Sequence, residues 1–432
     1  MKKAMIDAEI LERHNRQREA AHRRDLEYLA ERLARSGIVL EAVLDELATF
    51  EVALPTWAMA AGGTRFGRFP IPGEPRTIFE KLEDAAVIHQ LTRATPRVSP
   101  HFPWDVVDDW AALRAHAEAL GLGFDAVNSN TFQDQPDQPY SYKLGSLSHA
   151  DPAVRRQAIA HNLQVVAWGQ ELGSTALTVW LADGSNYPGQ MHLRRSFERV
   201  QESLAEIYAA LPEGWRMLIE YKPYEPAFYA TVIQDWGSAL LLAQALGERA
   251  QCLVDLGHHL PNTNIELIVA RLIGAGKLGG FHFNDAKYGD DDLTAGSIKP
   301  YQLFLVFNEL VDAAREGVPG FRPAYMIDQS HNVKDPIEAL LQTVDHLQRA
   351  YARALLVDRE ALSHYQETGD VLMAERTLRA AFETDVGPLV AEVRRRRGGA
   401  LDPVLAFRES GYRQQKARER STPATAQAPG YA

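Results

Sequence analysis

Short apolar segments alternate with segments of helical periodicity along the middle of this chain, and this alternation restricts the fold more than any other feature. Each apolar segment is dense enough in Val, Ile, Leu and Phe to be buried on both faces, as in a parallel sheet. They begin at Glu51, Arg97, Gly123, Ser174, Arg216, Gln251, Gly279 and Arg322. Eight strands over about 290 residues predict a closed (β/α)₈ barrel, since a doubly wound sheet usually stops at about five to seven strands.

Helical patterns flank the predicted barrel on both sides. We expect an N-terminal helical segment at residues 1–48, the barrel at 49–345 and a C-terminal helical extension at 346–418. This extension is longer than one barrel needs, so we expect it to make subunit contacts. Residues 419–432 have the composition of a disordered tail.

Charge and composition exclude several classes of partner. The net charge of −11 lacks the basic footprint of a nucleic-acid-binding protein, and no stretch of about 18 apolar residues predicts a membrane span. The basic run from Arg394 to Arg397 reads as a solvated helix end or a subunit contact. The single cysteine, Cys252, and an N-terminus too charged for a signal peptide predict a cytoplasmic protein.

Ionisable residues gather at the ends of four consecutive predicted strands, the fifth to the eighth. In such a barrel the carboxyl ends of the strands, with the loops that follow them, form the active site. Eight residues lie at these ends or just beyond them: Glu220, Lys222, Asp255, His258, His282, Asp290, Asp292 and Asp328.

The five carboxylates among these eight residues would repel one another strongly in one buried cup. Two divalent cations together with Lys222 would neutralise them, so we predict a two-metal site. Oxygen ligands with a minority of imidazoles suit Mn²⁺, Co²⁺ or Mg²⁺ better than structural zinc. Each acid alone is more often a helix cap or an ion-pair partner, and only the combination favours a metal site. We expect His259 and Asp291 to lie outside it, because alternate residues of an extended chain point in opposite directions.

Aromatic residues gather near the ends of the first four predicted strands: Trp57, Trp104, Phe132 and Trp180. They are either core at the mouth of the barrel or flat walls for the C–H faces of a sugar. His101 would face them and could take a proton from a sugar hydroxyl. Phe66, in the glycine-containing stretch GGTRF, would act as a lid over this site or over that of a neighbouring subunit.

Several stretches resemble the bacterial L-rhamnose isomerases of broad specificity, which are xylose-isomerase-like TIM barrels. They include WAMAAGGTRFGRFP, NSNTF, LTVWLADGSNYPGQ, CLVDLGHHLPNTNIE, GGFHFNDAKYGDDD and MIDQSHNVKDPIE, and the likeness runs from Glu51 to Tyr365. It implies a homotetramer with two Mn²⁺-type ions per subunit. It also implies a structural ion held by Glu220, Asp255, His282 and Asp328, and a catalytic ion held by His258, Asp290 and Asp292.

The same resemblance implies a reversible aldose to ketose isomerisation. Hydride would move between C1 and C2 while Lys222 donates a hydrogen bond to O1, and a water near Asp328 would move the proton between O1 and O2. The competing enediol route would use Glu220 or Asp328 as the base. Ser330 is expected to contact the sugar. Family members carry histidine where this chain has Tyr221, and we expect that difference to alter packing and substrate preference but not metal binding.

Three other functions fit parts of this pattern. A sugar 3-epimerase would need a second acidic strand end facing Glu220 across one metal. A metal-dependent phosphodiester hydrolase also surrounds its ions with Asp, Glu and His, but few basic residues lie near this rim. A non-catalytic sugar-binding scaffold would not need two ions.

Overall fold

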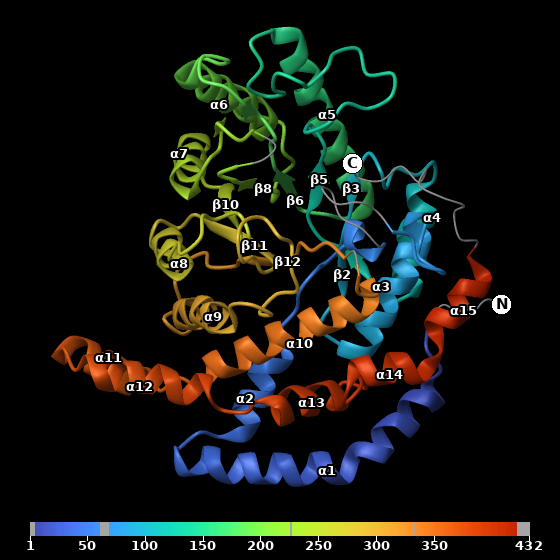
Figure 1. Cartoon of the computed structure of the whole chain (residues 1–432), viewed down its shortest axis with the longest axis vertical. Helices are drawn as coiled ribbons and strands as arrows, with labels where there is room; N and C mark the ends of the chain where they lie inside the picture. Colours follow the sequence, from blue (N-terminus) through green and yellow to red (C-terminus); the bar gives the residue numbers. More distant parts are fainter. Residues whose placement is uncertain (1–4, 61–68, 225–226, 332, 421–432) are drawn as a thin grey trace.

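The computed structural model describes residues 5–60, 69–224, 227–331 and 333–420, and Figure 1 shows a barrel with helices around and below it. Phe66 lies outside these ranges. The strands of the barrel are β1 (Leu54–Pro55), β2 (Arg97–Ser99), β3 (His101–Phe102), β4 (Gly123–Phe124), β5 (Val127–Ser129), β6 (Ala176–Val179), β8 (Arg216–Glu220), β10 (Ala250–Asp255), β11 (Leu278–Phe283) and β12 (Ala324–Ile327). Their ladders are all parallel, as predicted.

The sheet closes on itself between its first and last strands. The amide N of Ala53 donates to the carbonyl of Tyr325 at 2.8 Å, and the amide N of Ile327 donates to the carbonyl of Ala53 at 3.1 Å. β2 and β3 form one barrel strand that is interrupted at Pro100, and β4 and β5 form another that is interrupted at residues 125–126. The predicted (β/α)₈ barrel is therefore confirmed, with each of its eight strands at the predicted place.

Eight helices alternate with these strands and cover the outside of the barrel (Figure 1). Asp, Asn, Thr or His side chains accept a hydrogen bond from the first turn of seven of them, which fixes where those helices begin. The eight are α3 (Ile78–Thr92), α4 (Trp110–Ala119), α5 (Pro152–Leu172), α6 (Leu193–Ala209), α7 (Trp236–Leu246), α8 (Ile265–Gly274), α9 (Pro300–Arg315) and α10 (Pro336–Leu355).

The interior of the barrel holds a small apolar layer with the polar site next to it. The layer is separate from the main core and consists of Ala53, Ala126, Ala176, Leu218, Leu253 and Met326. Alternate residues of a strand point to the same face. Two positions beyond Leu218, Leu253 and Met326 the chain carries Glu220, Asp255 and Asp328. The strand pattern therefore directs these three carboxylates into the barrel, one layer closer to its carboxyl end.

The terminal helices form a layer below the barrel in Figure 1, except for the last, which rises along its side next to α3. They are α1 (Ala8–Arg35), α2 (Leu40–Ala48), α11 (Arg359–Thr368), α12 (Val371–Phe382), α13 (Gly387–Arg396), α14 (Pro403–Ser410) and α15 (Tyr412–Glu419). α1 packs along α13 and α14, while α11 and α12 pair with each other and project to one side. α10 continues across the expected boundary at residue 345, so the division between barrel and extension stays a prediction. No described helix is long and apolar enough to cross a membrane.

The prediction of a solvated or subunit-contacting basic run was wrong for Arg394, which is only 2% exposed. Its guanidinium lies 2.8 Å from a carboxylate oxygen of Asp345 and donates two hydrogen bonds to Oε1 of Gln348. Both partners lie on α10, so Arg394 joins α13 to the last helix of the barrel. A run of like charges predicts exposure only when no buried acid faces it.

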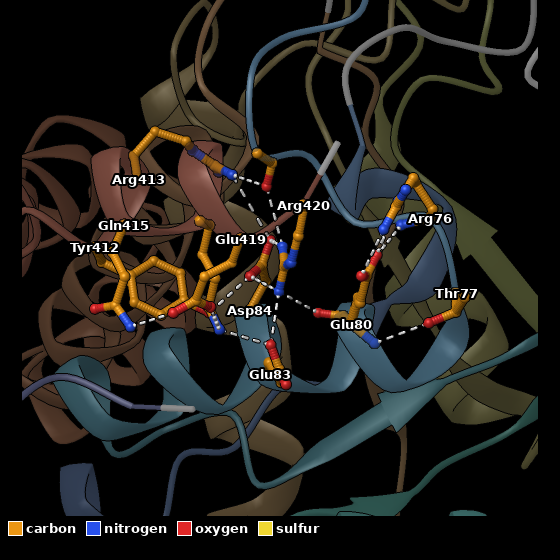
Figure 2. Close-up of polar contacts among 12 residues, drawn as sticks. Arg76, Thr77, Glu80, Glu83, Asp84, Tyr412, Arg413, Gln415, Glu419 and Arg420 are labelled. Carbon is orange, nitrogen blue, oxygen red and sulfur yellow. Dashed lines mark hydrogen bonds and ion pairs between the residues drawn. The ribbon is translucent and has the colours of Figure 1, made fainter. Parts of the chain in front are cut away.

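The last described residue, Arg420, is buried at the junction of α15 and α3 (Figure 2). Its guanidinium lies 2.9 Å from Oδ1 of Asp84 and 2.9 Å from Oε2 of Glu83. The hydroxyl of Tyr412 donates to Asp84 at 2.8 Å, and Arg413 pairs with Asp335 at 2.6 Å. We call Glu83, Asp84, Tyr412, Arg413 and Arg420 the Asp84 cluster. The chain is thus fixed through Arg420, although we expected a disordered tail from residue 419; residues 421–432 lie outside the described ranges.

Candidate metal centre and sugar pocket

The barrel brings two groups of metal-ligating side chains together at the carboxyl end of its strands. Glu220, Asp255, His282 and Asp328 form the first group, and within it one ligand atom from each residue lies within 4.8 Å of the others. Asp255, His258 and Asp290 form the second group under the same limit. Asp255 belongs to both groups, so the two groups lie next to each other.

Histidines link the carboxylates of the two groups. Nδ1 of His282 lies 3.1 Å from Oε1 of Glu220 and 3.5 Å from Oδ2 of Asp328. Nδ1 of His258 lies 3.2 Å from the same Glu220 oxygen, and its Nε2 lies 3.4 Å from Oδ1 of Asp290. Nε2 of His282 is buried and has no hydrogen-bond partner among the described residues.

The pKa values of these groups reflect the large negative charge gathered in the site. Burial, together with Asp328, Glu220 and Asp290, raises the pKa of Asp255 to about 7. Burial alone would lower the pKa of His282, but Glu220, Asp328 and Asp255 raise it to about 9. Burial favours neutral Glu220, yet His282 and His258 bring its pKa down to about 2. Carboxylates that hold protons near neutral pH, beside histidines that are forced to ionise, fit a site built for divalent cations.

Three further groups orient the ligands from outside. The side-chain amide of Asn284 donates to both carboxylate oxygens of Asp255, at 3.0 and 3.1 Å. The indole N–H of Trp57 donates to Asp328 at 2.7 Å. Nδ1 of His258 lies 3.0 Å from the carbonyl oxygen of Tyr221, an arrangement that leaves Nε2 of His258 to face Asp290. Such outer contacts fix the geometry of a metal site.

Lys222 brings the one lysine ammonium to this cluster of described residues. Its Nζ contacts Oδ2 of Asp290 and lies 5.1 Å from the centre of the Trp180 ring. The hydroxyl of Thr231 donates to the backbone carbonyl of Lys222 and holds the strand end in place. Lys222 is buried, so its charge is poorly screened and acts strongly on any nearby oxygen.

The three aspartates after β11 separate into different roles. Asp290 faces His258 and Lys222. The carboxylate of Asp291 instead accepts hydrogen bonds from the backbone of Lys287 and Tyr288, which fits its expected place outside the site. Oδ2 of Asp292 accepts the hydroxyl of Ser330 at 3.0 Å and is not in either ligand group. The assignment of Asp292 as a ligand and of Ser330 as a sugar contact therefore stays a prediction.

The expected aromatic residues meet next to the ligand groups at the barrel mouth. The ring of His101 lies 5.3 Å from Trp57, 4.9 Å from Trp104 and 5.7 Å from Phe132, measured between ring centres. Phe132 lies 4.7 Å from Trp180. Burial lowers the pKa of His101 to about 3, so the imidazole is neutral and can accept a hydrogen bond from a hydroxyl. Phe66 lies outside the described residues.

Two residues that support the site, Asp105 and Asn284, were not predicted from the sequence. Asp105 is buried and accepts hydrogen bonds from the hydroxyl of Thr56 at 2.5 Å, from Lys81 at 2.7 Å and from the amide N of His101 at 2.9 Å. It thereby joins the loops after the first and second strands. Their positions in the sequence could have indicated both residues. Asp105 follows the predicted site residue Trp104 in HFPWD. Asn284 lies two residues after His282, on the same face of the extended chain.

His259 and Tyr221 form a pair beside the ligands. The Tyr221 hydroxyl and Nε2 of His259 are 2.8 Å apart, and burial lowers the pKa of His259 to about 4. His259 is thus a neutral partner of Tyr221, which agrees with its expected place outside the ligand set.

Comparison with known proteins places this geometry in a family. The sequence pattern of the xylose isomerase-like TIM barrel family matches residues 87–321, more than half of the chain. The chain belongs to the xylose isomerase-like TIM barrel family. A probable sugar isomerase of Rhizobium meliloti is 60% identical over 416 residues, which cover 96% of this chain and 97% of that protein. One of Mesorhizobium japonicum is 58% identical over 420 residues, 97% of each chain.

More distant proteins share part of the sequence or the barrel fold. The xylose isomerase of Thermus thermophilus is 28% identical over 266 residues, 55% of this chain and 65% of that protein. A solved L-ribulose 3-epimerase superposes with a TM-score of 0.52 at 16% identity, covering 72% of this chain and 98% of that one. The latter likeness supports the fold alone. Together the similarities place the chain in the xylose isomerase-like barrel family, with two probable sugar isomerases among its relatives.

Proposed function

We propose that this protein is a metal-dependent aldose–ketose isomerase that interconverts L-rhamnose and L-rhamnulose, and that it also accepts related aldoses such as L-mannose, L-lyxose or D-allose. The observation that carries the proposal is the pair of ligand groups that share Asp255, placed beside Lys222 and next to a group of aromatic side chains. The high identity to two probable sugar isomerases over nearly the whole chain supports the same class of reaction.

The ligand groups fit two divalent ions, for which we propose Mn²⁺, with Co²⁺ or Mg²⁺ as the other candidates. Glu220, Asp255, His282 and Asp328 would hold one ion, and His258, Asp290 and Asp292 the other, with Asp255 near both. Bound there, the ions would supply Lewis-acid polarisation of the O1 and O2 oxygens of an opened sugar.

The protein's own side chains would position the sugar and handle its protons. Lys222 donates a hydrogen bond to O1 from a buried position, where its charge stabilises a developing alkoxide. Trp104, Phe132 and Trp180 cover the C–H faces of the sugar and exclude water. The neutral imidazole of His101 accepts a hydrogen bond from a distal hydroxyl. A water near Asp328 would move the proton between O1 and O2.

Two routes connect the aldose and the ketose. In the hydride route, the hydrogen on C2 moves with its electron pair to C1. In the enediol route, a carboxylate, that of Glu220 or Asp328, removes it as a proton. An aldose deuterated at C2 should keep its label at C1 of the product, whereas loss of the label to solvent would indicate the enediol route.

The test of the proposed function is the conversion of L-rhamnose to L-rhamnulose by chelator-treated protein, with and without added Mn²⁺. We expect ketose to form only after metal is restored. The variant Lys222→Met, loaded with Mn²⁺ to the same content, should lose at least about 100-fold in kcat because it lacks the donor to O1. Epimerised ketose without aldose to ketose conversion would instead establish a 3-epimerase, and no reaction with any aldose would contradict the proposal.

We also propose that the chain works in the cytoplasm as a homotetramer with contacts through its C-terminal helices. The projecting pair α11 and α12 carries exposed apolar side chains, with Val371 77% and Leu372 65% exposed. Apolar patches of this kind commonly mark protein contacts. Light scattering should show four chains per particle, and Val371→Asp should reduce that number.

A further inference from the structure

A cavity of about 290 Å³ lies beside the aromatic wall, between the loops that follow β5 and β6. Phe132 lines it together with Gln133, Lys143, Ala182, Gly184 and Ala227. The ring of Phe132 also contacts Trp180 and His101 of the sugar pocket. One aromatic side chain is therefore a wall of both spaces, and a molecule in the sugar pocket has a second compartment next to it.

Carboxylates hold the loop around this cavity in one conformation. Oδ1 of Asp183 accepts the hydroxyl of Ser146 at 2.6 Å, and its Oδ2 accepts the amide N of Ser148 at 2.8 Å. Asp134 accepts the amide N of Tyr142 at 2.7 Å. Both acids line the cavity, yet both carboxylate oxygens of Asp183 and Oδ1 of Asp134 already accept hydrogen bonds from the protein. The cavity is thus preformed, which reduces the entropy that a ligand loses on binding.

Gly184, one of the lining residues, lies directly against Ala227 and Ala230. A Cβ atom on Gly184 would lie 2.3 Å from the carbonyl oxygen of Ala230 and 2.4 Å from Cβ of Ala227. Gly184 begins β7 (Gly184–Ser185), which pairs antiparallel with β9 (Ala230–Thr231). A larger side chain at Gly184 could not be placed without moving this pair, so glycine is required for the close approach.

Two polar side chains that line the cavity have no protein partner in the described part of the chain. Within the described part of the chain, neither the amide of Gln133 nor the ammonium of Lys143 has a hydrogen bond or ion pair in the structure. An amide offers both donors and an acceptor, and an ammonium offers three donors. The Gln133 amide and the Lys143 ammonium could bind the hydroxyl groups of a sugar ring whose C–H face lies on the ring of Phe132.

The charge and size of the cavity decide between possible ligands. A phosphate would meet two carboxylates, Asp134 and Asp183, against the one cation Lys143 among the lining residues, so an anion is disfavoured. The volume lies at the small end of the range of about 300 to 1,000 Å³ for ligand pockets, which suits one ring rather than a large ligand. A neutral, hydroxylated ring satisfies both conditions.

We propose that this cavity binds a second sugar ring, so that the enzyme isomerises reducing disaccharides as well as free aldoses. The inference rests on the proposed function and names a substrate class for it. The reducing ring would open in the sugar pocket, and the hydrogen on C2 would move to C1 there. The second ring would lie against Phe132, and the glycosidic bond would stay intact.

The experiment compares the aldose that the metal-loaded enzyme turns over best with its 4-O-glucosyl derivative. We expect the disaccharide to be isomerised with a KM no higher than that of the free aldose. Lys143→Ala and Gln133→Ala should each raise the KM for the disaccharide about 3- to 10-fold, the effect of one lost hydrogen bond. Ala182→Phe, which fills the cavity, should raise it at least about 10-fold. For all three variants the KM for the free aldose should stay within about twofold, because none of these residues lies in the aldose pocket.

Lys287→Ala provides a matched control, because Lys287 is an exposed lysine on another loop at the barrel mouth, outside the cavity. It should change neither KM. Turnover of the free aldose without turnover of the disaccharide would overturn this inference and leave the proposed function intact. Equal effects of Ala182→Phe on both sugars would also overturn it. If no aldose is turned over, both the inference and the proposed function fail.

Discussion

Two buried charged regions of this molecule solve the same electrostatic problem in different ways. In the Asp84 cluster, each acid meets a guanidinium of the same chain: Arg420 lies 2.9 Å from both Asp84 and Glu83 (Figure 2). In the metal centre, Glu220, Asp255, Asp290 and Asp328 share one ammonium, that of Lys222. The protein thus neutralises the acids of the Asp84 cluster with its own arginines, but not those of the metal centre.

The titration of the metal centre follows from that shortage of positive charge. His282 takes up a proton with a pKa of about 9, and Asp255 keeps one up to a pKa of about 7. These protons substitute for cations that the polypeptide does not provide. The Asp84 cluster is therefore a structural joint, whereas the metal centre is a binding site. The following variants are chosen to break or sharpen this contrast.

Asp255→Asn should have the largest effect. Asp255 is the one residue that belongs to both described ligand groups, and an amide provides neither its charge nor a second anionic oxygen. We expect bound metal to fall below one ion per chain and kcat to drop on the order of 1,000-fold. Elemental analysis measures the metal content, and an assay of ketose formation measures kcat. Normal metal content in a folded variant would remove Asp255 from the ligand set.

Arg420→Ala should affect stability and not catalysis. Loss of the guanidinium leaves the carboxylate of Asp84 buried without its nearest partner, which should cost about 3 kcal/mol of unfolding free energy. Denaturant unfolding measures this, with Arg418→Ala as the control because Arg418 is exposed on the same helix. Metal content and kcat of the folded variant should equal those of the wild type. A loss of bound metal would show that the two regions are not separate.

Asn284→Leu should have the smallest effect of the three. It removes the two hydrogen bonds to Asp255 while keeping the number and branching of the side-chain heavy atoms. We expect the affinity for Mn²⁺ to fall about 10- to 100-fold, as for other outer contacts of metal ligands, and activity to recover at saturating metal. A metal titration of activity distinguishes this from damage to catalysis, which saturating Mn²⁺ would not restore.

The same contrast explains what the sequence could predict. Each strand end that carries Glu220, Asp255, His282 or Asp328 is a local feature, because an apolar run of a few residues fixes both the strand and the face of its last side chain. The barrel topology then brings these ends together. The candidate site was therefore largely predictable, including the gathering of Trp57, Trp104 and Phe132 around His101, with Trp180 against Phe132.

Pairs that form between distant elements could not be predicted in this way. Arg420 and Asp84 are 336 residues apart, and nothing near either residue marks the other as its partner. For the same reason Arg394 was expected to be exposed although Asp345 and Gln348 hold it in the interior. Whether Asp292 is a metal ligand depends on the path of the loop after β11. The alternation of side-chain directions along a strand does not determine that path.

The most direct test of the central claim is calorimetric titration of chelator-treated protein with Mn²⁺ at pH 6, 7 and 8. Occupied sites require His282 and Asp255 without their protons, so binding must release protons and the affinity must rise with pH, by about tenfold per unit for each proton released. We predict two ions per chain with this proton release. Absence of binding, or binding with the same affinity at all three pH values, would contradict the account.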